Sequence, residues 1–267
     1  ERFFNEARIT SAIADPGIVQ IFDYGHHTDG SAYIVMEYLH GETLRHRLRR
    51  LQGRLPLEQV LHTLWQVASA LVATHDAGIV HRDLKPENIM LVPDPIAPTG
   101  ERAKLLDFGI ARFDDGRHDR PSLTGGDVLG TPTYMSPEQC RGVGPISAKS
   151  DVYSLGVMLF QLLAGRPPFV SEGVGELLNM HMSQAPPDLL ALAPQTPAEL
   201  VALVHQSLDK DPEQRPTMRQ VVATLERLQA QKDIPGKPLV GDRSAPLASP
   251  LGVLGGVLSD SLAGLLG

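Results

Sequence analysis

The residues best suited to chemistry lie between positions 81 and 107. The segment HRDLKPEN places a carboxylate, an amine and an amide within six residues, at Asp83, Lys85 and Asn88, and a second carboxylate, Asp107, follows nineteen residues after Asn88. Phosphoryl transfer needs an acid to orient the attacking hydroxyl, a cation to offset charge on the moving phosphate, and oxygen ligands for Mg²⁺. Asp83 suits the first task, Lys85 the second, and Asn88 with Asp107 the third. The joint order and spacing of these residues therefore predict phosphoryl transfer.

Four motifs in this order resemble the protein kinase family, in its serine/threonine branch and in its bacterial members. They are HRDLKPEN, DFG at 107–109, GTPTYMSPEQ at 130–139 and SDVYSLGVMLFQLLAGRPPF at 150–169. The resemblance covers about residues 1–230. It implies an α+β, bilobal protein kinase-like fold, here with a partial small β-lobe and a mainly helical large lobe. It also implies ATP and Mg²⁺ as cofactors and proteins with Ser or Thr hydroxyls as substrates.

The same resemblance implies a role for each residue of the catalytic segment. Asp83 resembles the aspartate that accepts the proton of the substrate hydroxyl, and Lys85 resembles the lysine that marks serine/threonine kinases. Asn88 and Asp107 are similar to the two Mg²⁺ ligands. Two further residues of the motifs, His81 and Phe108, are expected to pack and not to react.

Residues 107–138 resemble an activation loop, which regulates the family by phosphorylation. Ser122 and Thr124 lie where regulatory phosphates commonly fall, and autophosphorylation there is expected. A phosphate could pair with Arg82 and order the loop. Thr131 resembles the threonine that contacts the catalytic aspartate and helps select Ser/Thr substrates.

Three further residues are expected to be architectural. Glu138 and Arg215 resemble the buried ion pair that ties the activation loop to the large lobe. Asp151 resembles the helix aspartate that accepts hydrogen bonds from the catalytic-loop backbone.

The nucleotide contacts implied by the resemblance lie at residues 33–39, which read as a strand that enters the hinge between the lobes. Met36 falls at the gatekeeper position, and the backbone groups of Glu37 and Leu39 are expected to meet the adenine. Met90 is expected to form the floor beneath it.

The chain departs from the family pattern at its start. The family begins with a glycine-rich loop and a strand lysine that hold the nucleotide phosphates, and neither occurs here. Glu6 resembles the helix glutamate that pairs with that lysine, but no lysine precedes Lys85. We expect the chain to be a fragment whose missing strands lie upstream, and the chain as given to be weakly active or inactive alone.

The apolar pattern predicts helices over residues 3–13, 57–76, 150–163, 197–208 and 217–231, and strands over 18–24, 32–36, 89–92 and 103–106, with a hairpin loop at 93–102. We expect a kinase domain at 1–232, with a small lobe at 1–36, a hinge at 37–41 and a large lobe at 42–232. Residues 233–267 read as a Pro/Gly-rich linker and an apolar tail.

Composition excludes some partners. The net charge of the 267 residues is −7, which gives no electrostatic case for nucleic acid or an anionic membrane. The single cysteine, Cys140, reads as a core thiol and indicates a reducing compartment, so a cytoplasmic location is expected. The apolar tail is shorter than the roughly 20 residues of a spanning helix and contains Asp260. A membrane anchor is left open only for sequence beyond residue 267.

Two other function classes fit part of the pattern. A pseudokinase would act as a binding or scaffold module, but it has no chemical need for an intact HRD, Asn88 and DFG. A small-molecule phosphotransferase shares an Asp-plus-Asn loop, but it lacks a peptide-docking segment such as GTPTYMSPEQ.

Overall fold

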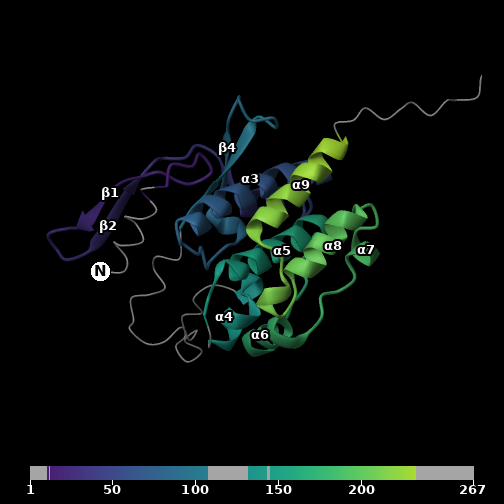
Figure 1. The fold of residues 1–267 in the computed structure, drawn as a ribbon. Helices are drawn as coiled ribbons and strands as arrows, with labels where there is room; N and C mark the ends of the chain where they lie inside the picture. The colour runs from purple at the N-terminus through teal and green to yellow at the C-terminus, as the bar shows by residue number, and fades with distance from the viewer. Residues whose placement is uncertain (1–10, 12, 108–131, 143–144, 233–267) are drawn as a thin grey trace, which may run out of the picture. The chain divides into compact units, whose positions relative to one another are not determined.

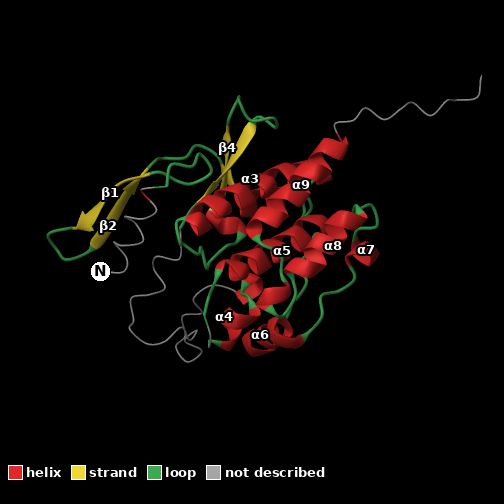
Figure 2. Cartoon of the chain, viewed as in Figure 1, coloured by secondary structure: helices red, strands yellow, loops and turns green. Residues whose placement is uncertain are grey.

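The computed structural model describes residues 11, 13–107, 132–142 and 145–232. The chain divides into two units, Glu1–Ile234 and Pro235–Gly267, and the second unit lies outside the described residues. The first unit mixes α-helices with two small antiparallel sheets (Figures 1 and 2). Its strands are β1 (Ile21–His26), β2 (Ala32–Met36), β3 (Glu42–Thr43), β4 (Ile89–Pro93) and β5 (Glu101–Leu105), and its α-helices are α2 (Leu44–Arg50), α3 (Leu57–Asp76), α4 (Pro137–Arg141), α5 (Ala148–Ala164), α6 (Val174–Ser183), α7 (Leu189–Leu192), α8 (Ala198–Ser207) and α9 (Met218–Lys232).

Strands β1 and β2 form an antiparallel hairpin (Figure 1), and β2 ends at Met36, just before the residues expected to form the hinge. The predicted strand at 18–24 is shifted toward the C-terminus, since β1 begins at Ile21. The residues before it pair elsewhere: the Val19 N–H donates to the Leu105 carbonyl at 3.0 Å, and the Leu105 N–H donates to the Gly17 carbonyl at 2.8 Å. The apolar pattern correctly predicted extended backbone near residues 18–24. It could not predict that the first of these residues pair with Leu105 while the later ones pair with β2.

The second sheet has the order β3-β4-β5 and carries the candidate catalytic residues at its ends. Ile89 pairs with Leu105 and Met90 with Lys104, so the segment before β4 lies beside the segment after β5. The apolar runs predicted at 89–92 and 103–106 form these two strands. Both strands extend a little into the predicted loop at 93–102, where Arg102 pairs with Asp94.

Helix α3 spans the residues predicted for it, and its apolar stripe is buried. Helix α9 lies along it, as Figure 1 shows. Polar contacts fasten the pair: Trp65 Nε1 donates to Glu226 Oε1 at 3.0 Å, and Gln229 Nε2 donates to the Leu61 carbonyl at 3.0 Å. These two helices, far apart in the sequence, therefore act as one layer of the large lobe.

Helix α5 is the most buried element, because every residue from Ser150 to Ala164 is covered. A helix that is covered on all sides lies inside its domain. It contacts α3, α8 and α9, and it ends at Gly165, whose φ of 83° suits a glycine cap. Any polar side chain on α5 is thus held in a low-dielectric environment.

The pattern analysis did not assign helices α2, α4, α6 and α7, each of ten residues or fewer. Such short segments show too few turns for an apolar period to be recognised. Local caps begin three of them: Thr43 accepts from the His46 N–H before α2, Ser136 forms a capping box with Gln139 before α4, and Asp188 accepts from the Leu190 N–H before α7.

Gly41, at the end of the hinge, provides a test of this packing. A Cβ at Gly41 would lie 2.1 Å from the Leu91 carbonyl oxygen, whereas a Cβ at Gly175 in α6 would meet nothing within 4 Å. We expect Gly41→Ala to lower the free energy of unfolding by about 1–3 kcal/mol, because backbone must move. We expect Gly175→Ala to be neutral or to raise it by up to about 1 kcal/mol. Urea denaturation of both variants measures the contrast, and equal effects would contradict it.

Candidate active site

The structure brings Asp83, Lys85 and Asn88 together on one loop. Lys85 Nζ donates to Asp83 Oδ2 at 2.7 Å. The Asn88 amide nitrogen donates to the Asp83 carbonyl at 2.9 Å and lies 3.3 Å from Asp83 Oδ2. The side chain of Asp83 is about one-fifth exposed, at 21%, so it is held in place yet open to a reactant. The three residues form one hydrogen-bonded cluster, as their spacing predicted.

The carboxylate of Asp151 holds this loop in place by accepting hydrogen bonds from its backbone. Its Oδ2 accepts from the His81 N–H and its Oδ1 from the Arg82 N–H, both at 2.9 Å. His75 Nε2 donates to the same Oδ2 at 2.7 Å, because a carboxylate can only accept. The Asp151 side chain is 1% exposed. The predicted role of Asp151 as a backbone acceptor agrees with these bonds.

Arg82 shows why the loop needs such support. Its φ is 65°, a left-handed value that costs a non-glycine residue about 1–3 kcal/mol. Its N–H is held by Asp151, and its carbonyl accepts from Gln139 Nε2 at 2.7 Å. The sequence analysis missed His75 and Gln139, since neither belongs to a motif of reacting groups. None of these contacts involves a phosphate, so the expected phosphate contact of Arg82 stays a prediction.

His81 is fully buried and serves as a link between segments. Its Nε2 donates to the Leu106 carbonyl at 3.0 Å, which fixes the proton on that nitrogen. Burial lowers its pKa, although Asp151 opposes this effect. A neutral, buried imidazole bonded to backbone is a packing residue, in agreement with the expectation for His81.

Asp107 lies at the end of β5, close in the fold to the start of β4. The Leu106 N–H donates to the Asn88 carbonyl at 2.9 Å, so Asp107 is one residue beyond a direct contact with Asn88. Asp107 is exposed and has a φ of 43°. The Asn88 amide nitrogen is engaged by Asp83, so its amide oxygen is the atom of that side chain that could act as a metal ligand. An amide and a carboxylate oxygen suit Mg²⁺, which takes few protein ligands and completes its shell with phosphate and water.

Among the described residues, no group of three or more His, Cys, Asp or Glu side chains could hold a metal ion. Asn88 and Asp107, the metal ligands expected from the sequence, would supply two oxygen donors. That donor set is compatible with Mg²⁺ and unsuited to zinc, which prefers nitrogen and sulfur.

Glu138 and Arg215 form a buried, bidentate ion pair. The two N–O distances are 2.8 and 2.9 Å, and Ser150 Oγ donates to Glu138 at 2.6 Å. Burial by itself would raise the pKa of Glu138, but the hydrogen bonds from Arg215 and Ser150 outweigh it and lower the pKa to about 2. Arg215 also donates to the carbonyl oxygens of Lys149 and Asp209. The pair predicted from the sequence thus ties α4, α5 and the segment before α9 together.

A small pocket opens beside the catalytic cluster. Its lining combines the loop that carries Asp83 with the segment before α4, and it consists of Arg82, Asp83, Leu84, Lys85, Tyr134, Met135 and Ser154. The Tyr134 hydroxyl donates to Gln161 at 2.6 Å, and Ser154 Oγ donates to the Tyr134 carbonyl at 2.7 Å. The pocket could admit a side-chain hydroxyl to the face of Asp83.

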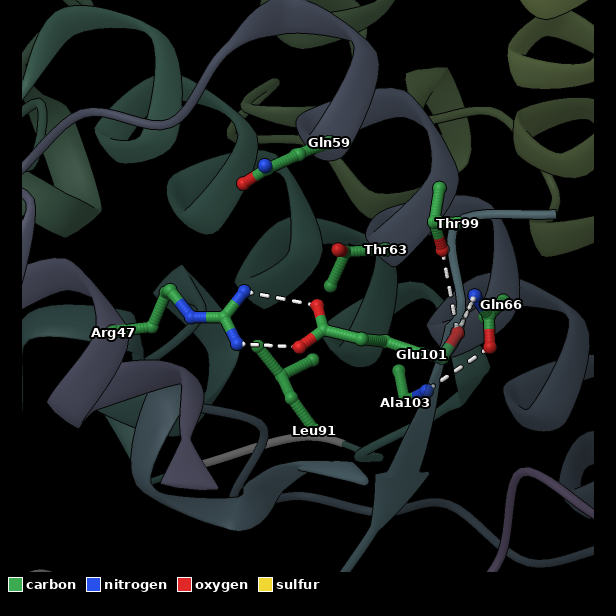
Figure 3. Close-up of a pocket in the computed structure, with 8 residues that line it drawn as sticks. All are labelled: Arg47, Gln59, Thr63, Gln66, Leu91, Thr99, Glu101 and Ala103. Carbon is green, nitrogen blue, oxygen red and sulfur yellow. Dashed lines mark hydrogen bonds and ion pairs between the residues drawn. The ribbon is translucent and has the colours of Figure 1, made fainter. Parts of the chain in front are cut away.

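A second pocket shares no residue with the catalytic loop (Figure 3). In it, Arg47 of α2 makes a bidentate pair with Glu101 of β5 at 2.7 and 2.9 Å, and Gln66 of α3 bonds the backbone of Glu101 and Ala103. The hydrogen bonds that Arg47 donates to Glu101, and secondarily to Glu42, raise the pKa of Arg47. These polar groups join α2 and α3 to β5, which is an architectural role.

The predicted nucleotide residues surround the hinge. Met36 ends β2 and is 42% exposed, and Leu39 is half-buried. The Glu37 side chain pairs with Lys104 and accepts from the Gln20 N–H at 2.8 Å, while its own N–H donates to the Gln20 carbonyl. Met90 pairs with Lys104 in the neighbouring sheet. The Glu37 N–H is thus engaged within the chain, and adenine contacts there stay a prediction.

The predicted residues Glu6, Phe108, Ser122, Thr124 and Thr131 lie outside the described residues. Cys140 is partly buried, and burial, assisted by Glu138, raises its pKa to about 12, as fits an unreactive thiol. Within the part of the chain that the structure describes, no helix has the length and apolar character needed to span a membrane.

Comparison with known proteins identifies similar chains. A family model described as "Protein kinase domain" matches residues 1–225. Serine/threonine-protein kinase pkn3 of Myxococcus xanthus is 40% identical over 219 residues, which are 80% of this chain and 39% of that protein. Serine/threonine-protein kinase PknA of Mycobacterium tuberculosis is 38% identical over 270 residues, 98% of this chain and 59% of that protein. The chain therefore spans less than two thirds of the length of either relative.

The buried ion pair provides a stability test. Arg215→Met leaves the Glu138 carboxylate buried without its partner, and we expect a loss of about 3–5 kcal/mol in the free energy of unfolding. Arg227→Met, which breaks an exposed pair with Glu199, should cost less than about 1 kcal/mol. Urea denaturation at pH 7 measures both, and similar losses would contradict the assignment.

The same pair predicts a pH dependence. The pKa of Glu138 is about 2 in the folded chain and 4.5 as its ordinary value, so the carboxylate stabilises the fold fully above about pH 4.5. That contribution should be lost progressively as the pH falls from about 4.5 toward 2. Unfolding measured across this range should show a smaller fall for Glu138→Gln than for the wild type. An identical pH profile in both proteins would show that Glu138 is not the group responsible.

Asp151→Asn tests the support of the catalytic loop. The Asn side chain has a single oxygen, so it can accept from only one of the two backbone N–H groups. Its N–H₂ group then faces the other N–H, and two donors oppose each other. We expect a loss of about 1.5–3 kcal/mol in the free energy of unfolding. Asp76→Asn, at an exposed aspartate of α3, is the control and should leave stability within about 0.5 kcal/mol. Thermal unfolding of the two variants decides the matter.

Proposed function

This chain belongs to the protein kinase family, and on that premise we propose that it transfers the γ-phosphate of ATP to Ser and Thr hydroxyls of proteins. The observation that carries the proposal is the cluster of Asp83, Lys85 and Asn88 beside a small pocket that Asp83 and Lys85 themselves line. The relatives at about 40% identity are named serine/threonine-protein kinases, which supports the substrate class. The bacterial character expected from the motifs agrees with their organisms.

In the proposed reaction, Asp83 accepts the proton of the substrate hydroxyl. Lys85 lies 2.7 Å from Asp83, where its charge would also offset the negative charge of the transferring phosphate. Asn88 fixes the orientation of Asp83 through its amide nitrogen. Positioning and charge stabilisation are the main contributions that a protein makes to phosphoryl transfer.

ATP and Mg²⁺ are the proposed cofactors. Asn88 and Asp107 would hold the metal through oxygen atoms, and the metal would neutralise charge on the phosphates. The backbone of Glu37 and Leu39 and the side chain of Met90 are proposed to contact the adenine. Glu6 is proposed to take the place of the helix glutamate of the family.

We propose that autophosphorylation at Ser122 or Thr124 regulates the activity, with Arg82 receiving the phosphate and Thr131 helping to select the acceptor. The domain is proposed to comprise residues 1–232, followed by a linker and tail at 233–267. We also propose a cytoplasmic location and no nucleic-acid partner, on the basis of the single cysteine and the net charge of −7.

Asp83→Asn tests the proposal in the full-length protein that contains this chain. Intact mass after incubation with Mg²⁺-ATP should show added phosphate on the wild type. The Asn variant should lose phosphotransfer by about 10²–10⁴-fold, because it cannot accept the proton, while nucleotide binding stays nearly unchanged. Asp76→Asn, at an exposed aspartate, should behave as the wild type.

A different result would favour the pseudokinase alternative. If neither the wild type nor the Asn variant adds phosphate to itself or to a generic protein substrate, the chain acts as a binding module. If the Asn variant keeps near-normal turnover, the assignment of Asp83 as the proton acceptor is wrong.

A further inference from the structure

A second charged pair lies next to the catalytic cluster. Arg45 of α2 is 3.5 Å from Glu87, measured between Nε and Oε1, and both side chains are part-exposed, at 39% and 42%. Glu87 lies in the short turn of 3₁₀ helix between Lys85 and Ile89, one residue before Asn88. The pair is thus at the edge of the site where a protein substrate would present its hydroxyl.

Arg45 also acts on a residue that lines the small pocket beside Asp83. Its guanidinium interacts electrostatically with Tyr134, which lines that pocket, and the Tyr134 hydroxyl donates to Gln161 at 2.6 Å. Burial, together with the charge of Glu87, raises the pKa of Tyr134, so the hydroxyl stays protonated. Arg45 therefore links the carboxylate of Glu87 to the wall of the pocket that holds Asp83.

The geometry of this pair differs from that of the structural ion pairs in the same chain. Arg215 with Glu138 and Arg47 with Glu101 are both bidentate, with N–O distances from 2.7 to 2.9 Å. In the Arg45–Glu87 pair, Arg45 Nε and Glu87 Oε2 have no hydrogen-bond partner among the described residues, although both atoms are buried. A carboxylate oxygen without a donor is costly, so the Arg45–Glu87 pair is less complete than the two bidentate pairs and Arg45 is held less firmly in it.

We propose that Arg45 determines which peptide charge the site accepts, by occupying Glu87 and so withholding it from basic substrate residues. The proposal rests on the proposed kinase function and names a substrate class for the same site. A free carboxylate beside the acceptor would attract a peptide that carries Arg or Lys. With Arg45 in place, such a peptide must displace a cation that is already there, while a neutral or acidic peptide meets no such barrier. The other carboxylate of the loop, Asp83, is already paired with Lys85.

The test uses the full-length protein and a set of Thr-containing peptides. In each peptide, a single Arg or Ala occupies one position on either side of the acceptor Thr, so that no assumption is made about where the basic residue lies. Two quantities are measured for each matched pair: the ratio of kcat/KM for phosphorylation, and the ratio of Kd for binding to the Asp83→Asn variant. The second quantity needs no turnover.

We expect the wild type to show little preference for Arg peptides over Ala peptides. Arg45→Ala should raise the preference for Arg by about fivefold at one or more positions, the upper size of a part-exposed ion pair. Arg45→Lys should keep the wild-type ratio, because it retains the charge. Glu87→Gln in the Arg45→Ala background should remove the gain, because the carboxylate is then absent.

Arg50→Ala is the matched control, since Arg50 lies on the same helix and pairs with Glu42 instead of Glu87. It should leave both ratios as in the wild type. Unchanged ratios in Arg45→Ala, or a gain that survives Glu87→Gln, would overturn the role of Arg45. Absence of phosphorylation in every protein would instead refute the kinase function, and the binding ratio would still decide the role of Arg45.

Discussion

The Asp151 carboxylate is the contact on which the candidate site depends. It is buried in α5, and it accepts the backbone N–H groups of His81 and Arg82, the two residues that precede Asp83. A carboxylate in a low-dielectric interior must be fully hydrogen-bonded, and here the loop supplies two donors and His75 the third. The left-handed backbone at Arg82 is maintained by this contact and by Gln139. The orientation of Asp83 is thus held by residues that are not among the proposed reacting groups.

The same helix connects the catalytic loop with the segment that would receive a protein substrate. Ser154 of α5 holds the Tyr134 carbonyl, Gln161 holds its hydroxyl, and Ser150 supports Glu138 at the start of α4. Arg215 then joins Glu138 to the backbone before α9. Because α5 is covered on all sides, these polar contacts form in a rigid interior, where the packing of neighbouring helices limits their movement. Helix α5 therefore supports both the small pocket beside Asp83 and the loop that carries Asp83.

Charge pairing in the chain follows two patterns. Pairs that hold elements together, such as Arg215 with Glu138, are bidentate, and further bonds satisfy their remaining donors. The pair of Arg45 with Glu87 is longer and leaves one atom of each side chain without a hydrogen bond among the described residues. This difference in completeness, and not the mere presence of charges, separates an architectural pair from one that could exchange partners with a ligand.

The sequence by itself determined the family, the identity and order of the reacting groups, and the long helices. HRDLKPEN and DFG fixed Asp83, Lys85, Asn88 and Asp107 because the chemistry requires those residue types at that spacing, and helix α3 has the predicted bounds because twenty residues carry a clear apolar period. Only the tertiary structure decided that residues 17–19 pair with Leu105 and not within the β1–β2 hairpin. It also decided where the short helices form and which groups His75, Gln139 and Arg45 contact. These depend on segments that lie far apart in the chain, such as His75 and Asp151, 76 residues apart, and Ile18 and Leu105, which are farther apart still. A local pattern carries no information about which distant groups will meet.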